Sequence, residues 1–210
     1  MLGDATRVLV ALLALLVLAS CGSGDPEGPA VTGITTSDDD GYNGVLLERK
    51  YDVPSIPLTD TEGKRFDLAE QPKRTLVFFG YTNCPDICQV VMSTIASALP
   101  RLPDEQRDEL QVAFVTTDPA RDDENALRTY LDRFDPAFVG LTGSLQDIVA
   151  LGRPMDVMIR EGRKLPSGGY EVDHSTVVVS VQGGRGDLVW TGATSPAEMT
   201  EDLTKLLEDA

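Results

Sequence analysis

An apolar run leads directly into a pair of cysteines in the segment Phe78-Phe79-Gly80-Tyr81-Thr82-Asn83-Cys84-Pro85-Asp86-Ile87-Cys88. Residues 76–79 are wholly apolar, which predicts a buried strand. Residues 80–83 predict a tight turn, and Pro85 predicts the first residue of a helix, where its missing N–H costs nothing. We therefore expect a strand, a turn and a helix over 85–99, with Cys84 at the helix N-terminus.

Cys84 and Cys88 have the spacing C-x-x-x-C, which places both sulfurs on one face of a helix, one turn apart. Partial positive charge at a helix N-terminus favours the thiolate over the thiol. It can lower a cysteine pKa from about 8.5 to between about 3.5 and 7.5, so we expect both thiols to ionise near neutral pH. The pair suits a disulfide or a soft metal ion, and two helix cysteines that only pack are the alternative.

Composition limits the classes of function. The chain has 210 residues, 41% of them hydrophobic, and this is enough for one sizeable core. Its 34 acidic residues outnumber its 18 basic ones, giving a net charge of −16. Because nucleic-acid binding depends on cations that neutralise phosphates, nucleic acid is excluded as the expected partner. We expect a single domain over residues 44–210.

The N-terminus predicts export. Residues 8–18 are apolar but too few for a comfortable membrane span, and Leu18-Ala19-Ser20-Cys21 follows. This pattern resembles a bacterial lipoprotein signal, which implies that residues 1–20 are a signal peptide and that Cys21 is acylated. Residues 21–43 are poor in large apolar side chains and are expected to form a flexible tether. An ordinary secretory signal or an uncut anchor is the alternative, and each of these places the domain outside the cytoplasm, where disulfides are permitted.

The pattern of the remaining chain predicts an α/β domain of thioredoxin-like fold, with a central mixed sheet flanked by helices and an N-terminal β-hairpin. The expected strands are the hairpin over 53–68, then 75–79, 110–116, 138–141, 155–159, 176–181 and 188–191. The expected helices begin at Pro85, at a cap formed by Asp122, at Ser144 and at Ser195. Residues 161–170 are expected to form a glycine-rich, charged loop.

Three motifs recur in a fixed order: Thr82-Asn83-Cys84-Pro85-Asp86-Ile87-Cys88, then Thr117-Asp118-Pro119-Ala120-Arg121-Asp122, then Tyr170-Glu171-Val172-Asp173-His174-Ser175-Thr176. Over residues 45–207 the sequence resembles the SCO/SenC family, thioredoxin-fold copper proteins that help to assemble the binuclear CuA centre of cytochrome c oxidase. The resemblance implies a membrane-anchored, extracytoplasmic copper chaperone. Its implied partners are subunit II of the oxidase and a thioredoxin-like reductant or another copper carrier.

The resemblance also implies that Cys84, Cys88 and His174 bind one copper ion. Two thiolates favour soft Cu(I), and an imidazole is acceptable to both copper states. We expect His174 to lie in a mobile loop and to close on the metal after the thiolates have bound it. Asp118, at a strand end, is expected to orient a ligand or tune its charge.

Other residues near the cysteines have less specific expectations. Asp86 stabilises a helix N-terminus in any fold, and a role in partner docking is a second interpretation. Tyr81 is expected to pack. Met155 and Met158 are soft donors by chemistry, but their predicted strand favours packing in the core.

Three other functions use the same residues. A thiol-disulfide oxidoreductase is the main alternative, although the C-x-x-x-C spacing and the absence of proline in His174-Ser175-Thr176 disfavour it. A peroxidase needs an arginine close to a lone cysteine, and neither cysteine has one nearby in the sequence. A structural zinc site from Cys84, Cys88, His174 and Asp118 is chemically allowed but is an unusual arrangement.

Overall fold

The computed structural model describes residues 41–164 and 170–208, which belong to a compact unit that extends from Ile34 to Ala210. Its strands are β1 (Val45–Asp52), β2 (Pro57–Asp60), β3 (Arg65–Asp67), β4 (Arg74–Gly80), β5 (Leu110–Thr116), β6 (Val139–Thr142), β7 (Ile159–Lys164), β8 (Tyr170–His174), β9 (Val177–Gln182) and β10 (Arg185–Thr191). Its α-helices are α2 (Ile87–Ala98), α3 (Asp104–Asp108), α4 (Glu124–Leu131), α5 (Leu145–Gly152) and α6 (Pro196–Glu208). Single 3-10 turns are η1 (Leu68–Glu70), η2 (Leu99–Arg101) and η3 (Arg153–Met155).

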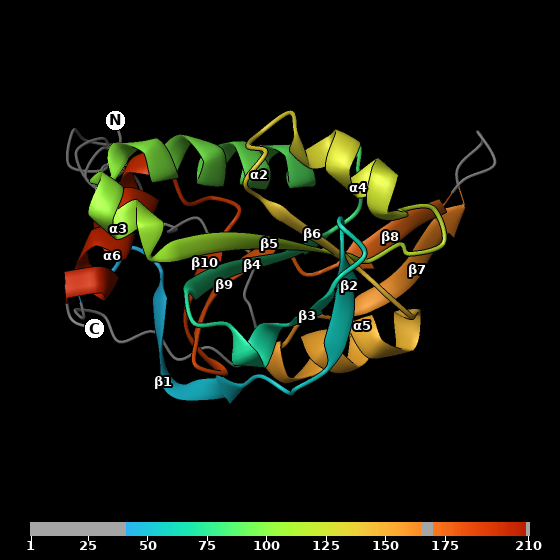
Figure 1. Ribbon diagram of the computed structural model, residues 1–210, viewed down its shortest axis with the longest axis horizontal. Coiled ribbons are helices and arrows are strands. Elements are labelled where there is room, and N and C mark those ends of the chain that lie inside the picture. The colour runs from blue at the N-terminus through green and yellow to red at the C-terminus, as the bar shows by residue number, and fades with distance from the viewer. Residues whose placement is uncertain (1–40, 165–169, 209–210) are drawn as a thin grey trace, which may run out of the picture. The chain divides into compact units, whose positions relative to one another are not determined.

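An eight-stranded mixed sheet forms the centre, in the order β1-β10-β9-β4-β5-β6-β2-β3. Strands β4, β5 and β6 run parallel, and Gly80 at the end of β4 lies opposite Thr116 at the end of β5. On its other side β4 pairs with β9 in antiparallel register, with Phe78 opposite Val178. The expected mixed sheet with flanking helices is confirmed (Figure 1).

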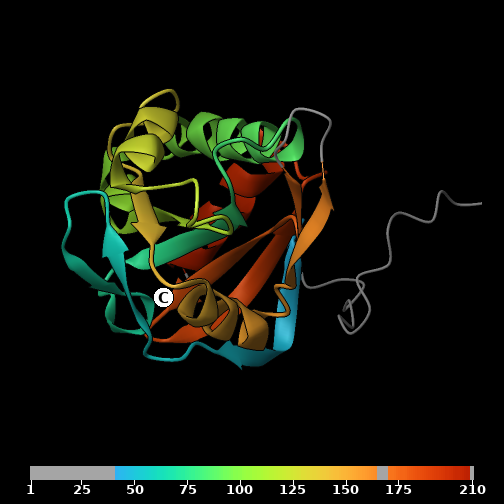
Figure 2. The same cartoon turned by 90° about the vertical axis from the view of Figure 1, so that its right-hand side faces the viewer.

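Alternating residues of the central strands enter two separate cores. Phe78 and Phe114 pack with α2, α4 and α6 in one core, whereas Phe79 and Val115 pack with α5 in the other. Figure 2 shows this layering, with α2 and α4 on one side of the sheet and α5 on the other. Residues 74–80 are all buried, because a central strand covered on both faces has no solvent side.

Helix N-termini follow the predicted capping signals in two of four cases. Ser144 accepts a hydrogen bond from the main-chain N–H of Asp147, and Ser195 and Glu198 form a reciprocal capping box. The cap predicted at Asp122 is wrong, because Asp123 caps α4 by accepting from Ala126 N at 2.7 Å. The side chain of Asp122 has other partners, which are described below.

Helix α2 begins at Ile87, and the predicted start at Pro85 is wrong. Residues 85–86 form a bend, and the cap residue Asp86 has φ −142° and ψ −89° with no side-chain cap hydrogen bond. Cys84 therefore precedes the helix, while Cys88 lies in its first turn. The proline sets the approach of the chain to the helix without entering it.

The region before β9 differs from the prediction. The charged segment expected to be a loop contributes two antiparallel strands, β7 and β8, with Ile159 opposite His174. The predicted strand over 155–159 is replaced by η3, a left-handed residue at Asp156 with φ 55°, and the start of β7. Met155 is buried as expected, whereas Met158 is 60% exposed and its predicted core position is wrong.

The N-terminal part of the domain contains a strand that the sequence did not reveal. β1 pairs with β10 at the sheet edge, and it precedes the antiparallel pair β2–β3, in which Leu58 lies opposite Phe66. The predicted signal peptide, Cys21 and most of the tether lie outside the described residues. In the part that is described, no helix has the length and apolar character needed to cross a membrane.

Candidate metal site

The cysteine turn, residues 81–84, projects from the end of β4. Thr117 N donates to Gly80 O at 2.6 Å, which ties the end of β4 to the loop after β5. Cys84 N donates to Tyr81 O at 3.1 Å and closes the turn. Gly80 permits this packing, because a Cβ there would come within 2.9 Å of the Phe78 ring. The turn is therefore fixed to the carboxyl edge of the central parallel strands.

The two sulfur-bearing residues are adjacent and shielded from water. Cys84 is 5% exposed and Cys88 is 0% exposed, and both are free thiols. Cys88 N donates to Cys84 Sγ at 3.4 Å, so the first turn of α2 directs a main-chain N–H at this sulfur. The predicted convergence of the two cysteines at the start of one helix is thus present, although Cys84 is not itself helical.

The pKa of Cys88 is raised above its usual value. A side-chain hydrogen bond with Cys84 is the largest cause, and burial, which disfavours the thiolate, is the second. The expectation of a lowered pKa for both cysteines is therefore wrong for Cys88. Its thiol is already a partner of the neighbouring sulfur, and it lies too deep for the charge of the helix end to prevail.

Asp118 lies at the same edge of the sheet, as expected, and is 2% exposed. Its carboxylate forms an ion pair with Arg121. The guanidinium of Arg121 lies over the ring of Tyr81, 6.0 Å from the ring centre. Tyr81 is buried, consistent with its expected packing role, and it is the first residue of the cysteine turn. Asp118 therefore reaches the turn through Arg121 and Tyr81.

The backbone of His174 also reaches this edge. Because β4 and β9 are antiparallel with Phe78 opposite Val178, the residues after Phe78 and the residues before Val178 extend beyond the same end of the sheet. Cys84 belongs to the first group and His174, the last residue of β8, to the second. The side chain of His174 lies outside the description, and among the side chains that are described no cluster of three metal-binding residues is found.

Two buried residues beside the cysteines escaped the sequence analysis as site residues. Asp122 is 0% exposed and bonds to the turn, and the only sequence signal was its place in the D-P-x-R-D motif. Tyr130 on α4 is 2% exposed, and its hydroxyl has no hydrogen-bond partner in the part of the chain that is described. Its pKa is raised by burial and then by the charges of Cys88 and Cys84. The sequence marked Tyr130 only as a core position.

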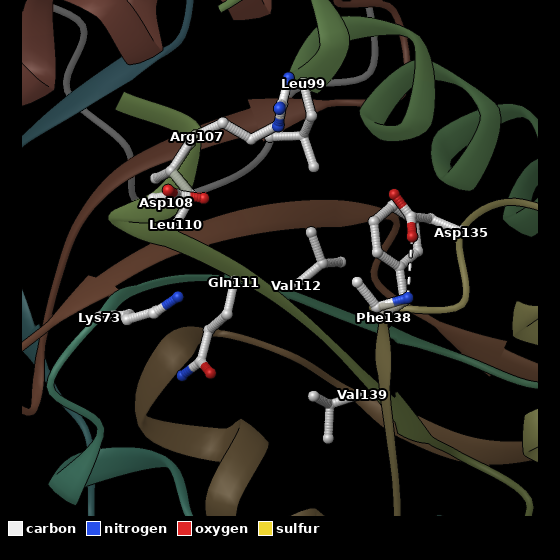
Figure 3. A pocket seen from close by; sticks show the side chains of 11 residues that line it. Lys73, Leu99, Arg107, Asp108, Leu110, Gln111, Val112, Asp135, Phe138 and Val139 are labelled. Atoms are coloured by element: carbon white, nitrogen blue, oxygen red, sulfur yellow. Dashed lines mark hydrogen bonds between the residues drawn. The ribbon is translucent and has the colours of Figure 1, made fainter. Parts of the chain in front are cut away.

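A hollow of about 340 Å³ lies elsewhere in the domain (Figure 3). It contains Lys73, Arg107, Asp108 and Asp135 beside apolar side chains, and Leu110 to Val112 at the start of β5 line it. The cysteine turn lies beyond the other end of the sheet, where Gly80 pairs with Thr116. The hollow is therefore separate from the candidate metal site.

Known proteins share this sequence and fold. A copper-binding protein of Stutzerimonas stutzeri is 34% identical over 137 residues, which cover 65% of this chain and 67% of that protein. The chain spans less than half the length of the mitochondrial SCO2 proteins of Danio rerio and Saccharomyces cerevisiae, which it also matches.

Solved structures agree with the sequence relatives. The apo Sco1 protein of Thermus thermophilus has a TM-score of 0.71 at 29% identity, covering 79% of this chain and 96% of that one. ScoI of Bradyrhizobium japonicum with copper bound has a TM-score of 0.64 at 28% identity, covering 75% and 97% respectively. The model of the SCO1/SenC family matches residues 50–208. The chain therefore belongs to the SCO1/SenC family.

Proposed function

We propose that this protein is a copper chaperone that binds one copper ion through Cys84, Cys88 and His174. The observation that carries the proposal is the buried pair of free thiols, one of which receives a main-chain hydrogen bond from the other residue. Two sulfur donors and one imidazole favour Cu(I) and tolerate Cu(II). Copper-bound relatives of the same fold support this choice of metal.

The proposed client is the CuA centre in subunit II of cytochrome c oxidase, as the family resemblance implies. Transfer proceeds by ligand exchange: the client offers cysteine and histidine ligands, shares the ion with Cys84 and Cys88, and then takes it. The copper is cargo, so it moves without release to water. Met158, 60% exposed and bonded through its main chain to Ser175, lies next to His174 on the accessible side of this edge.

We propose that oxidation controls loading. Two adjacent thiols can form a disulfide, which removes both thiolate ligands, and a thioredoxin-like reductant or an equivalent thiol would restore them. The same adjacency favours a second candidate function, thiol-disulfide exchange with the oxidase or another exported protein. In that case His174 would have no part in the reaction.

We further propose that residues 1–20 are a signal peptide and that acylated Cys21 anchors the protein at the extracytoplasmic face of the cell membrane. Residues 21–43 would then tether the domain close to its client. Cys21→Ser tests this point: the wild-type protein should fractionate with membranes and carry lipid by mass spectrometry, and the variant should lose the lipid. A wild-type protein with an unmodified Cys21 would contradict the anchor.

Titration of the reduced protein with Cu(I), Cu(II) and Zn(II) tests the function. We expect one tightly bound copper, a thiolate-to-copper charge-transfer band with Cu(II), and weakened binding in His174→Ala. Transfer to a copper-free oxidase subunit II domain should follow only from the loaded wild type. An oxidoreductase would instead reduce a model disulfide equally well with and without His174, and would not need copper.

A further inference from the structure

Asp122 is a fully buried carboxylate that bonds directly to the cysteine turn. Its Oδ2 accepts from Thr82 N at 2.9 Å, and its Oδ1 accepts from Thr82 Oγ1 at 2.6 Å. Oδ2 also accepts from Thr116 Oγ1 at 2.7 Å. Both oxygens are therefore satisfied, and one residue of the turn is bound through its main chain and its side chain together.

These bonds occur without a positive partner. Among residues 41–164 and 170–208, no lysine or arginine forms an ion pair with Asp122, and the nearby Arg121 pairs with Asp118. A buried carboxylate without a cation depends on its hydrogen-bond donors to offset the cost of desolvation. The charge is thus retained only while Thr82 and Thr116 keep their places.

The bonds to Thr82 determine the position of Cys84. Thr82 lies inside the turn that the bond from Cys84 N to Tyr81 O closes, so fixing Thr82 fixes the main chain that carries this sulfur. The sulfur of Cys84 then accepts the N–H of Cys88. The main chain of Asp122 is itself held, because its N–H donates to Asp118 O and its C=O accepts from Thr142 Oγ1.

We propose that Asp122 is a positioning residue for copper binding: its buried carboxylate holds Thr82 so that Cys84 stays beside Cys88 in the arrangement that takes the ion. This inference rests on the proposed function for its biological meaning, but the geometry of the two sulfurs can be measured without copper. The negative charge adds a second effect, since an uncompensated anion beside the site favours a bound cation.

Asp122→Asn keeps the shape of the side chain but removes the charge and one acceptor oxygen, so the pair of bonds to Thr82 cannot persist. Asp123→Asn is the matched control, since Asp123 only caps α4 and asparagine is an equally good cap. Thr82→Val removes the hydroxyl bond, and Thr82→Ser retains it. Urea unfolding of the copper-free proteins identifies any loss of folding and limits the comparison to folded protein.

The first readout is Cu(I) affinity by competition with a chromophoric chelator, together with the charge-transfer band of the Cu(II) form. We expect Asp122→Asn and Thr82→Val to lose at least about tenfold in affinity, about 1.4 kcal/mol, and to shift the band. Asp123→Asn and Thr82→Ser should match the wild type. A folded Asp122→Asn protein with wild-type affinity and an unshifted band would overturn the inference.

The second readout uses no copper. In equilibrium with oxidised glutathione, the thiols of Cys84 and Cys88 form a disulfide and release two molecules of reduced glutathione. Asp122→Asn should lower this equilibrium constant at least about tenfold, a potential change of about 30 mV, because the sulfurs are no longer held together. An unchanged constant would overturn the inference. If the wild type bound no copper, the proposed function would fail and this measurement would still decide the role of Asp122.

Discussion

The main-chain N–H of Cys88 donates to the sulfur of Cys84 across 3.4 Å. This one contact joins the turn after β4 to the first turn of α2, and it brings the two buried thiols to the same point of the sheet edge. A helix N-terminus favours negative charge, so the contact stabilises a thiolate at Cys84 more than a thiol. The pair is therefore arranged for metal capture before any metal arrives.

Oxidation is predicted to abolish copper uptake. Both thiols are free in the structure and adjacent, so a mild oxidant should join them and remove both sulfur ligands. We expect oxidised protein to bind no more copper than the double variant Cys84→Ser, Cys88→Ser, and a reductant to restore one equivalent. Thiol counting together with copper analysis after gel filtration measures this. Full copper uptake by the oxidised protein would contradict the sulfur site.

Asp202 is predicted to be a major determinant of stability. This carboxylate, 1% exposed, accepts from Trp190 Nε1 at 2.7 Å, from Asn43 N at 2.8 Å and from Gly44 N at 2.8 Å. Asp202→Ala leaves these donors without an acceptor and should lower the free energy of unfolding by about 3 kcal/mol. Urea unfolding followed by the fluorescence of Trp190, the single tryptophan, measures the change.

The neighbouring variant Glu201→Ala is the control, because Glu201 contacts only the exposed amide of Asn43 at 3.4 Å. We expect its effect to stay within about 0.5 kcal/mol. Copper affinity should be unchanged in both variants. Equal stability of Asp202→Ala and Glu201→Ala would show that Asp202 does not fasten the start of the domain to α6.

Stability should fall at high pH through Tyr51. Burial, and next the charge and hydrogen bond of Asp156, raise the pKa of Tyr51 to about 12. Because the folded pKa lies above the usual value of 10.0, the stabilisation is complete below pH 10 and is lost as the pH rises to about 12. Solvent screening at this half-buried site reduces the effect to about 1 kcal/mol.

Tyr51→Phe keeps the ring and removes the titrating hydroxyl. Its free energy of unfolding, measured in urea from pH 9 to 12, should decline less steeply than that of the wild type. Identical slopes would show that Tyr51 contributes nothing to the pH dependence.

Local patterns were sufficient where a residue's own chemistry sets the structure. The apolar runs gave β4 and β5, and the Ser195 and Glu198 pair gave the start of α6. They were insufficient where a distant partner decides. Asp122 and Asp123 are both good caps, and only the presence of Thr82 and Thr116 beside the first explains why the second caps α4.

The site shows the same division. The C-x-x-x-C spacing was enough to predict that Cys84 and Cys88 meet, because an i to i+4 separation is a local property. The pKa of Cys88 was not predictable, since it depends on burial and on the hydrogen bond between the thiols. Strand β1 was missed because its residues are polar or half-exposed, and its pairing with β10 stabilises it as an edge strand.

X-ray absorption at the copper edge of the Cu(I)-loaded, reduced protein tests the central claim most directly. The account predicts one copper ion with two sulfur donors and one imidazole nitrogen. In His174→Ala the imidazole signal should disappear while both sulfur donors remain, and in Cys84→Ser one sulfur donor should be lost. An unchanged nitrogen signal in His174→Ala, or a wild-type spectrum without two sulfur donors, would contradict the account.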